Sequence, residues 1–146
     1  MLVSGILKDK GDMVFTASPG DTVAAVAAML HHRRVGAMVV VEGDRKVAGI
    51  VSERDIVRVV AEQGAAALGK PISACMSRDV IFADPSESVD SLLERMTDRR
   101  IRHLPVCDQG ALIGIVSIGD LVNWTISAHE ATIGHLQGYI EGRYPG

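Results

Sequence analysis

A short pattern that occurs twice constrains the fold of this chain more than any other feature. The stretch "GIVSERDIV" at residues 49–57 returns as "GIVSIGDLV" at residues 114–122, 65 positions later. Upstream residues also match, at a spacing of 66 positions: Pro19 with Pro85, Val26 with Leu92, and Arg34 with Arg100. The change of spacing by one residue falls in a turn, where a structural repeat tolerates a deletion. The chain therefore contains two copies of one structural unit.

Each copy predicts the order strand, helix, strand, strand, helix. The apolar runs "MVFTA" and "VIFA" favour a short strand, and each precedes a helix whose apolar residues recur at three and four positions. Thr22 or Asp21 is expected to cap the first of these helices, and Ser88 or Glu87 the second. "AMVVVEGDRKVAGIV" and "HLPVCDQGALIGIV" are typical of two strands joined by a glycine-containing turn.

The composition indicates a folded α/β protein with an aliphatic core. Hydrophobic residues make up 47% of the 146 residues but aromatic residues only 3%, and the strands are continuous apolar runs that favour sheets covered on both faces. A formal net charge of −3 gives no general attraction to nucleic acid or anionic lipid. No apolar run is long enough to cross a membrane, and the N-terminus does not resemble a signal peptide. We therefore expect a cytoplasmic protein without a nucleic-acid or membrane partner.

The repeat also sets the expected domain boundaries. Gly64 is a helix stop, and the segment "AEQGAAALGKPIS" that contains it is a connector. The first repeat is expected to span residues 1–66 and the second residues 67–128. Residues 129–146 are expected to form a C-terminal helical extension, whose apolar positions serve either a self-association surface or additional core.

With these features in place, the chain resembles the paired CBS domains, also called the Bateman module. The resemblance covers residues 14–128 and rests on the doubled G-[IV]-V-S-x-x-D signature and the order of elements. The stretches "SERD", "IRHLPV" and "SIGD" are similar to those of small stand-alone prokaryotic members. The resemblance implies an α/β (α+β) fold of two pseudo-twofold-related β-α-β-β-α repeats packed sheet to sheet. It further implies two clefts for adenosine nucleotides and a homodimer shaped as a disc of four repeats.

The chemistry of the doubled signature agrees with a ribose-binding role. A serine at a strand end and an aspartate three residues later face the same way in the first turn of a helix. A carboxylate accepts hydrogen bonds from both ribose hydroxyls, as acidic residues do in dinucleotide-binding folds. The alternative is that Ser52 and Ser117 only cap their helices, while Asp55 and Asp120 bind first-turn amides. The duplication favours ribose binding.

The resemblance also assigns candidate nucleotide-binding residues to each cleft. One cleft combines a threonine, a backbone segment, two basic residues and the second signature, namely Thr16, Val35, Gly36, Ala37, Met38, Arg102, His103, Ser117 and Asp120. The other combines Ser52, Arg54 and Asp55 with Phe82, which replaces the threonine and either stacks on a base or plugs the cleft. Arg102, His103 and Arg54 are candidate phosphate ligands. Their alternative roles are a solvated arginine, a packed histidine and an exposed helix charge.

These features predict a regulatory module that senses AMP, ADP, ATP or NAD(H) and changes conformation on binding. We expect no obligatory cofactor, no metal and no catalytic residue, with an unknown protein regulated in trans. One alternative is a structural or interaction scaffold that binds no ligand. A nucleotide-processing enzyme is less favoured, because the serines and aspartates are engaged by ribose and no nucleophile and base stand together.

Overall fold

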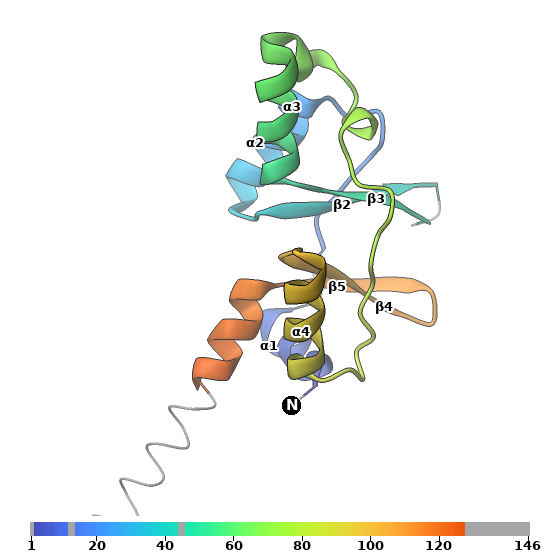
Figure 1. Cartoon of the computed structure of the whole chain (residues 1–146). Coiled ribbons are helices and arrows are strands. Elements are labelled where there is room, and N and C mark those ends of the chain that lie inside the picture. The colour runs from blue at the N-terminus through green and yellow to red at the C-terminus, as the bar shows by residue number, and fades with distance from the viewer. Residues whose placement is uncertain (1, 12–13, 44–45, 128–146) are drawn as a thin grey trace, which may run out of the picture.

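Two small sheets face each other in the computed structural model of the chain, which describes residues 2–11, 14–43 and 46–127 (Figure 1). The first sheet contains β1 (Thr16–Ala17), β2 (Ala37–Glu42) and β3 (Lys46–Ser52) in that order, and the second contains β4 (His103–Asp108) and β5 (Ala111–Ser117). Each hairpin is antiparallel, and β1 is parallel to β2. This arrangement confirms the expected α/β class with two repeats packed sheet to sheet.

Helices cover the outer face of each sheet, as the continuous apolar strands predicted. α2 (Val23–Arg33) and α3 (Glu53–Gln63) lie over the first sheet, whereas α4 (Val89–Arg99), the helical segment 118–127 and α1 (Val3–Lys10) lie over the second (Figure 1). The expected caps are present, since Thr22 Oγ1 accepts a hydrogen bond from the Ala25 amide and Ser88 Oγ from the Ser91 amide, both at 3.1 Å. Among the α-helices of the described residues, α1 is the one that the sequence pattern did not predict.

The two hairpins repeat each other in register. Ala37 pairs with Ser52 and His103 with Ser117, and each hairpin has a register shift at the matching place on β2 or β4. The short strands that open each copy are less regular than expected. β1 has two residues, and its counterpart is a single parallel bridge between Ala83 and Val106.

The hydrophobic cores are completed by an exchange of segments between the repeats. Val3 and Ile6 of α1, a segment assigned above to the first repeat, are buried in the core of the second. Conversely Ala67, Ile72 and Met76, which lie beyond the expected boundary at residue 66, are buried in the core of the first. Each repeat is therefore closed by the chain that leads into the other repeat, and this places the connector next to the space between the two sheets.

The predicted helix stop is confirmed, although the first three residues of the predicted connector still belong to α3. We call residues 64–81, which lead from α3 into the second core, the connector. Gly64 ends α3 with φ 67°, a backbone conformation that favours glycine. Two short 3₁₀ helices follow, Gly64–Gly69 and Ile72–Ala74. The predicted extension at residues 129–146 lies outside the described part of the chain. Within that part, none of the helices has the length and apolar character needed to span a bilayer.

Candidate functional site

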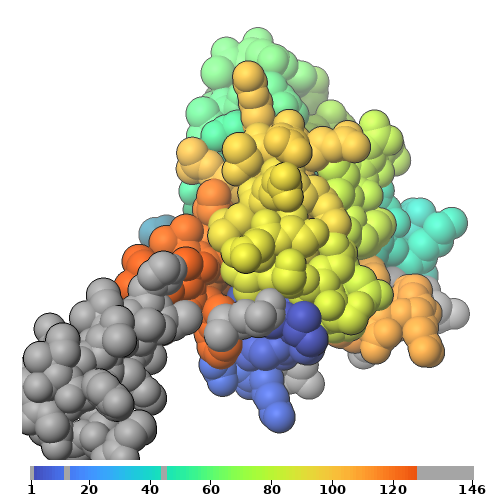
Figure 2. Space-filling view, turned by 60° about the horizontal axis from the view of Figure 1, so that its bottom comes forward, coloured from blue at the N-terminus to red at the C-terminus, as the bar shows by residue number. Residues whose placement is uncertain are grey.

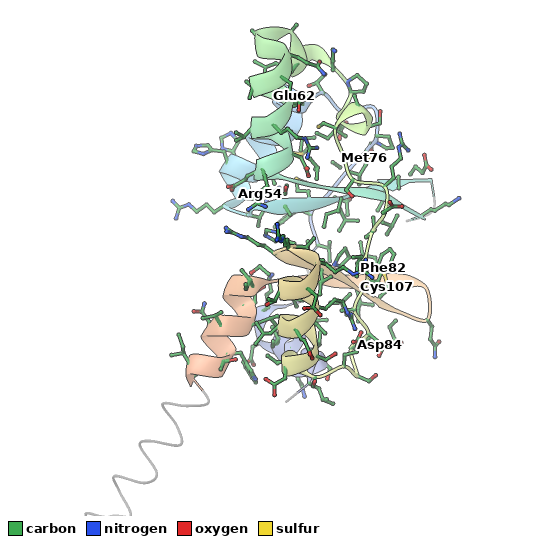
Figure 3. The ribbon with its side chains drawn as sticks, in the orientation of Figure 1. Arg54, Glu62, Met76, Phe82, Asp84 and Cys107 are labelled. Atoms are coloured by element: carbon green, nitrogen blue, oxygen red, sulfur yellow. The ribbon has the colours of Figure 1, made fainter. Side chains whose placement is uncertain are left out.

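A cavity of about 360 Å³ lies between the repeats and is lined by both of them. The first repeat contributes the start of β2 and the junction between β3 and α3, with Gly36, Ala37, Ile50, Ser52, Glu53, Arg54 and Asp55. The connector contributes Ser77, Asp79, Val80 and Ile81, and the second repeat Arg100, Ile101, Arg102, His103 and Pro105. We call this space the inter-repeat cavity. Figure 3 shows Arg54 at the base of α3, where that helix meets its sheet.

The first signature forms a closed hydrogen-bonded unit at the wall of this cavity. Asp55 Oδ2 accepts hydrogen bonds from the Ser52 amide at 2.9 Å and from Ser52 Oγ at 3.0 Å, and the Asp55 amide donates to Ser52 Oγ. Asp55 Oδ1 is 3.1 Å from Arg58 Nη2 on the next turn of α3. The capping role left open above is thus realised in the structure. It fixes the direction of the Asp55 carboxylate, which also lines the cavity.

Three arginines give the cavity a basic rim. Arg54, Arg100 and Arg102 line it and are exposed, and within the described residues none of the three forms a salt bridge with an acid. Glu53, Asp55 and Asp79 supply the acidic groups of the same lining. Apolar side chains form the remaining wall, with Ile50, Val80, Ile81, Ile101 and Pro105. The cavity therefore combines an apolar slot, a fixed carboxylate and guanidinium groups free to bind an anion.

His103 closes the cavity against the first repeat. A Cβ atom on Gly36 would lie 3.1 Å from His103 Nε2, so a larger residue there would require the ring to shift. Burial lowers the pKa of His103, and the Lys10 ammonium and Arg102 lower it further. The carboxylates of Asp120 and Glu53 act in the opposite direction without reversing the shift. His103 is therefore neutral at pH 7.

This shift predicts a pH effect on stability. Because the pKa of His103 in the folded chain is below the ordinary 6.5, the unfolded chain binds the proton more readily as the pH falls through that value. The contribution of His103 to stability is complete above about pH 6.5 and is lost below it. We expect His103→Gln to show a smaller fall in melting temperature between pH 7.5 and pH 5.5 than the wild type. Identical falls in melting temperature in both proteins would contradict this prediction. The control is His32→Gln, which replaces an exposed histidine.

The second signature has a different environment. Asp120 Oδ2 accepts a hydrogen bond from the Ser117 amide at 2.8 Å, and the Asp120 amide donates to Ser117 Oγ at 3.1 Å. Lys10 Nζ of α1 also lies 2.6 Å from Asp120 Oδ2. Burial alone would raise the pKa of Asp120, but the hydrogen bonds from Lys10 and Ser117 and the Lys10 charge outweigh it and hold the pKa below its ordinary value. We call Ser117, Asp120 and Lys10 together the Asp120 site.

The structure groups the predicted residues differently from the two clefts described above. Arg102, His103, Gly36 and Ala37 were assigned with Asp120, but they line the inter-repeat cavity together with Ser52, Arg54 and Asp55. Six predicted residues do not line it: Thr16, Val35, Met38, Phe82, Ser117 and Asp120. Met38 and Val35 belong to the first core, and Phe82 and Thr16 are exposed.

Several cavity residues were not among the predicted site residues. Arg100 and Ile101 directly precede the predicted Arg102. All three belong to the basic stretch "RRIRH", which is the sequence signal for them. Ser77 and Asp79 lie beyond the predicted connector, and Val80 and Ile81 begin the run "VIFA" that was predicted as a strand, so none of the four was assigned a binding role. Their position follows from an isolated antiparallel bridge, in which the Ile50 and Ser77 amides and carbonyls exchange hydrogen bonds of 2.9 Å.

The described residues do not assemble a metal centre. No group of three or more His, Cys, Asp or Glu side chains suited to a metal ion occurs among them. Cys75 and Cys107 are free thiols, and burial is the main cause that raises the pKa of each. Neither is in the thiolate form at neutral pH.

Comparison with known proteins agrees with this doubled architecture. The profile described as "CBS domain" matches twice, at residues 11–62 and 72–127. A mitochondrial CBS domain-containing protein, CBSX3 of Arabidopsis thaliana, is 36% identical over 97% of this chain and 73% of its own length. The crystal structure of a CBS-domain-containing protein from Agrobacterium tumefaciens has a TM-score of 0.84 and 41% identity, covering 86% of this chain and 99% of that one.

One similar structure carries a nucleotide. A CBS domain protein from Pyrobaculum aerophilum, complexed with AMP, has a TM-score of 0.73 and 30% identity, covering 82% of this chain and 89% of that one. The doubled profile match extends over most of the sequence and coincides with the two structural repeats. This chain is therefore a member of the CBS domain family and contains a tandem pair of these domains.

Proposed function

We propose that this chain is a regulatory module that binds an adenosine nucleotide, AMP, ADP, ATP or NAD(H), in the inter-repeat cavity. The observation that carries the proposal is the meeting of the Asp55 carboxylate with Arg54, Arg100 and Arg102 around one cavity. Its volume of about 360 Å³ is within the range of roughly 300–1,000 Å³ of small-molecule sites. The AMP complex of a relative with the same fold supports the same ligand class.

Each part of the nucleotide has a partner of suitable chemistry in the cavity. The ribose hydroxyls donate hydrogen bonds to the Asp55 carboxylate. In doing so they displace the exposed Arg58 side chain from Asp55 Oδ1. The apolar residues Ile50, Val80 and Ile81 offer a slot for the flat adenine ring. The arginines on the rim bind phosphate oxygens through their planar donor forks.

Binding between two repeats suits regulation rather than catalysis. A ligand that contacts both repeats and the connector favours the relative packing in which all its contacts are made, and thereby shifts the population of conformations. An unidentified protein would read this shift in trans. The homodimer and the cytoplasmic location expected from the sequence remain predictions. Exposed apolar side chains on α3 and the segment 118–127 support self-association: Val57, Ile118, Val122 and Ile126.

The proposal is tested by titrating AMP and adenosine separately into the wild type, Arg102→Gln and Arg99→Gln by calorimetry. We expect AMP to bind more tightly than adenosine, because only AMP carries a phosphate for the arginines. Arg102→Gln should weaken AMP binding about tenfold and leave adenosine nearly unchanged, since one charge-assisted hydrogen-bonding group contributes about 1.5 kcal/mol or more. Arg99→Gln removes an exposed charge at the end of α4, outside the cavity lining, and should have no effect.

Two results would reject the proposal. Absence of binding by AMP, ATP and NADH at millimolar concentration would favour a scaffold that binds no nucleotide. Conversion of the bound nucleotide during long incubation with magnesium would instead indicate an enzyme. Equal binding of AMP and adenosine would retain the nucleoside site but remove the role assigned to the arginines.

A further inference from the structure

The carboxylate of the Asp120 site is already bound by a cation from another part of the chain. Lys10 Nζ donates to Asp120 Oδ2 at 2.6 Å and to the Ile115 carbonyl at 2.9 Å. Lys10 is the last residue of α1, and Ile115 lies on β5 as the second residue of the second signature. The ammonium group therefore joins the N-terminal helix to both the strand and the helical turn that carry the second signature.

α1 is held firmly enough to keep Lys10 in this position. Figure 2 shows α1, in blue, packed beside the segment 118–127, in orange-red, and α4, in yellow. Val3 and Ile6 are buried, and the Val3 and Ser4 amides donate to the Glu87 and Pro85 carbonyls at 2.9 Å. Leu7 lies so close to Gly114 that a Cβ atom there would be 2.6 Å from Leu7 Cδ2. The lysine thus extends from a docked helix and not from a free terminus.

The matching carboxylate of the first repeat is differently placed. Asp55 is paired with Arg58, whose side chain is 54% exposed and lies three residues away on the same helix. Such an exposed local pair contributes little and is readily replaced by a ligand. Asp55 also lines the inter-repeat cavity, whereas Asp120 does not. The two signatures are alike in sequence, but the inter-repeat cavity is lined by the carboxylate residue of the first signature and not by that of the second.

We propose that Lys10 is an internal occupant of the Asp120 site, where its ammonium group takes the place that a ribose diol takes at Asp55. This inference rests on the proposed function, because it assumes that Asp55 binds ribose. Each chain then binds one nucleotide, and Lys10 determines which of the two signatures is used. A ribose at Asp120 would have to break the charge-assisted hydrogen bond from Lys10, whose ammonium group would keep only the Ile115 carbonyl as an acceptor.

The number of AMP molecules bound per chain tests this inference. By calorimetry with full-length protein, we expect one AMP for the wild type and two for Lys10→Met, which keeps the length of the side chain but removes its charge. Lys8→Met is the matched control, because Lys8 is an exposed lysine of the same helix, and it should bind one. The additional site of Lys10→Met should be lost in Lys10→Met/Asp120→Asn and retained in Lys10→Met/Asp55→Asn.

The single tryptophan of the chain reports whether the variant keeps its fold. Trp124 lies 3.8 Å from the position of a Cβ atom on Gly5 of α1, so release of the helix would change its fluorescence. Lys10→Gln, which can still donate to the Ile115 carbonyl, serves as a second variant if Lys10→Met releases α1, and it too should bind two AMP molecules.

Each outcome decides between the two proposals. Two AMP molecules bound by the wild type, or only one bound by both Lys10 variants, would overturn the role of Lys10 while leaving nucleotide binding intact. No binding by any of these proteins would remove both proposals. If the wild type binds none and Lys10→Met binds one at Asp120, the role of Lys10 stands and the assignment of Asp55 falls.

Discussion

Replacing Gly49 with alanine is expected to lower the free energy of unfolding by about 2–3 kcal/mol, because overpacking at a fixed backbone contact costs about this much. A Cβ atom at this position would lie 2.6 Å from the Ser77 carbonyl oxygen and 2.8 Å from Met76 Sδ. The Ser77 carbonyl cannot move aside freely, since it accepts a hydrogen bond of 2.9 Å from the Ile50 amide. The substitution therefore opposes the bridge that docks the connector on the first repeat.

Gly114 is the matching glycine of the second repeat and gives a sharp comparison. A Cβ atom there would also lie 2.6 Å from its nearest neighbour, but that neighbour is Leu7 Cδ2, the end of a flexible side chain. We expect Gly114→Ala to cost about 1 kcal/mol, at the low end for overpacking. Gly69→Ala meets nothing within 4 Å at a conformation open to alanine and should be nearly neutral.

Urea unfolding followed by circular dichroism measures all three variants. Thermal unfolding adds a second readout, with a fall in melting temperature of roughly 4–12 °C expected for Gly49→Ala at about 2–4 °C per kcal/mol. Equal losses for Gly49→Ala and Gly114→Ala would show that the carbonyl of Ser77 yields as easily as a leucine methyl group. Because Ile50 and Ser77 line the inter-repeat cavity, Gly49→Ala should also weaken AMP binding in the folded protein.

Much of the fold was predictable from local signals, and most of these signals occur once in each repeat. The caps at Thr22 and Ser88, the helix stop at Gly64 and the paired strands depend on residues close together in the sequence. α1 gave no such signal, and its place on the second core is set by buried contacts between residues about eighty positions apart, such as Val3 and Glu87. The exchange of segments between repeats is a tertiary property that no local pattern encodes.

The candidate site was predictable in its residue types but not in its grouping. The doubled signature located Asp55 and Asp120 and gave them equal chemistry. Their difference arises from partners elsewhere in the chain, since Lys10 binds one of them and the connector residues Ser77 to Ile81 border the cavity of the other. Sequence symmetry therefore overstated the symmetry of the sites, because the segments that complete them are not repeated.

The same asymmetry leads to the largest expected effect on ligand binding. We expect Asp55→Asn to weaken AMP binding about 100-fold, because a charged acceptor for two ribose hydroxyls contributes about 1.5–3 kcal/mol. The amide oxygen of asparagine can still accept from the Ser52 amide, now 2.9 Å from Asp55 Oδ2, so the helix cap is retained. A loss of affinity with little change in melting temperature would therefore report on the ligand and not on folding.

Asp120→Asn is the matched variant, with the same change of charge at the equivalent place in the repeat. It removes the partner of Lys10, and Asp120 does not itself line the inter-repeat cavity, so the affinity of the wild-type site for AMP should change little. If Asp120→Asn abolished binding and Asp55→Asn did not, the ribose would lie at Asp120, and Lys10 would be a group that yields to the ligand. The ratio of the two affinities, measured by calorimetry at one pH, thus decides which copy of a duplicated signature binds the nucleotide.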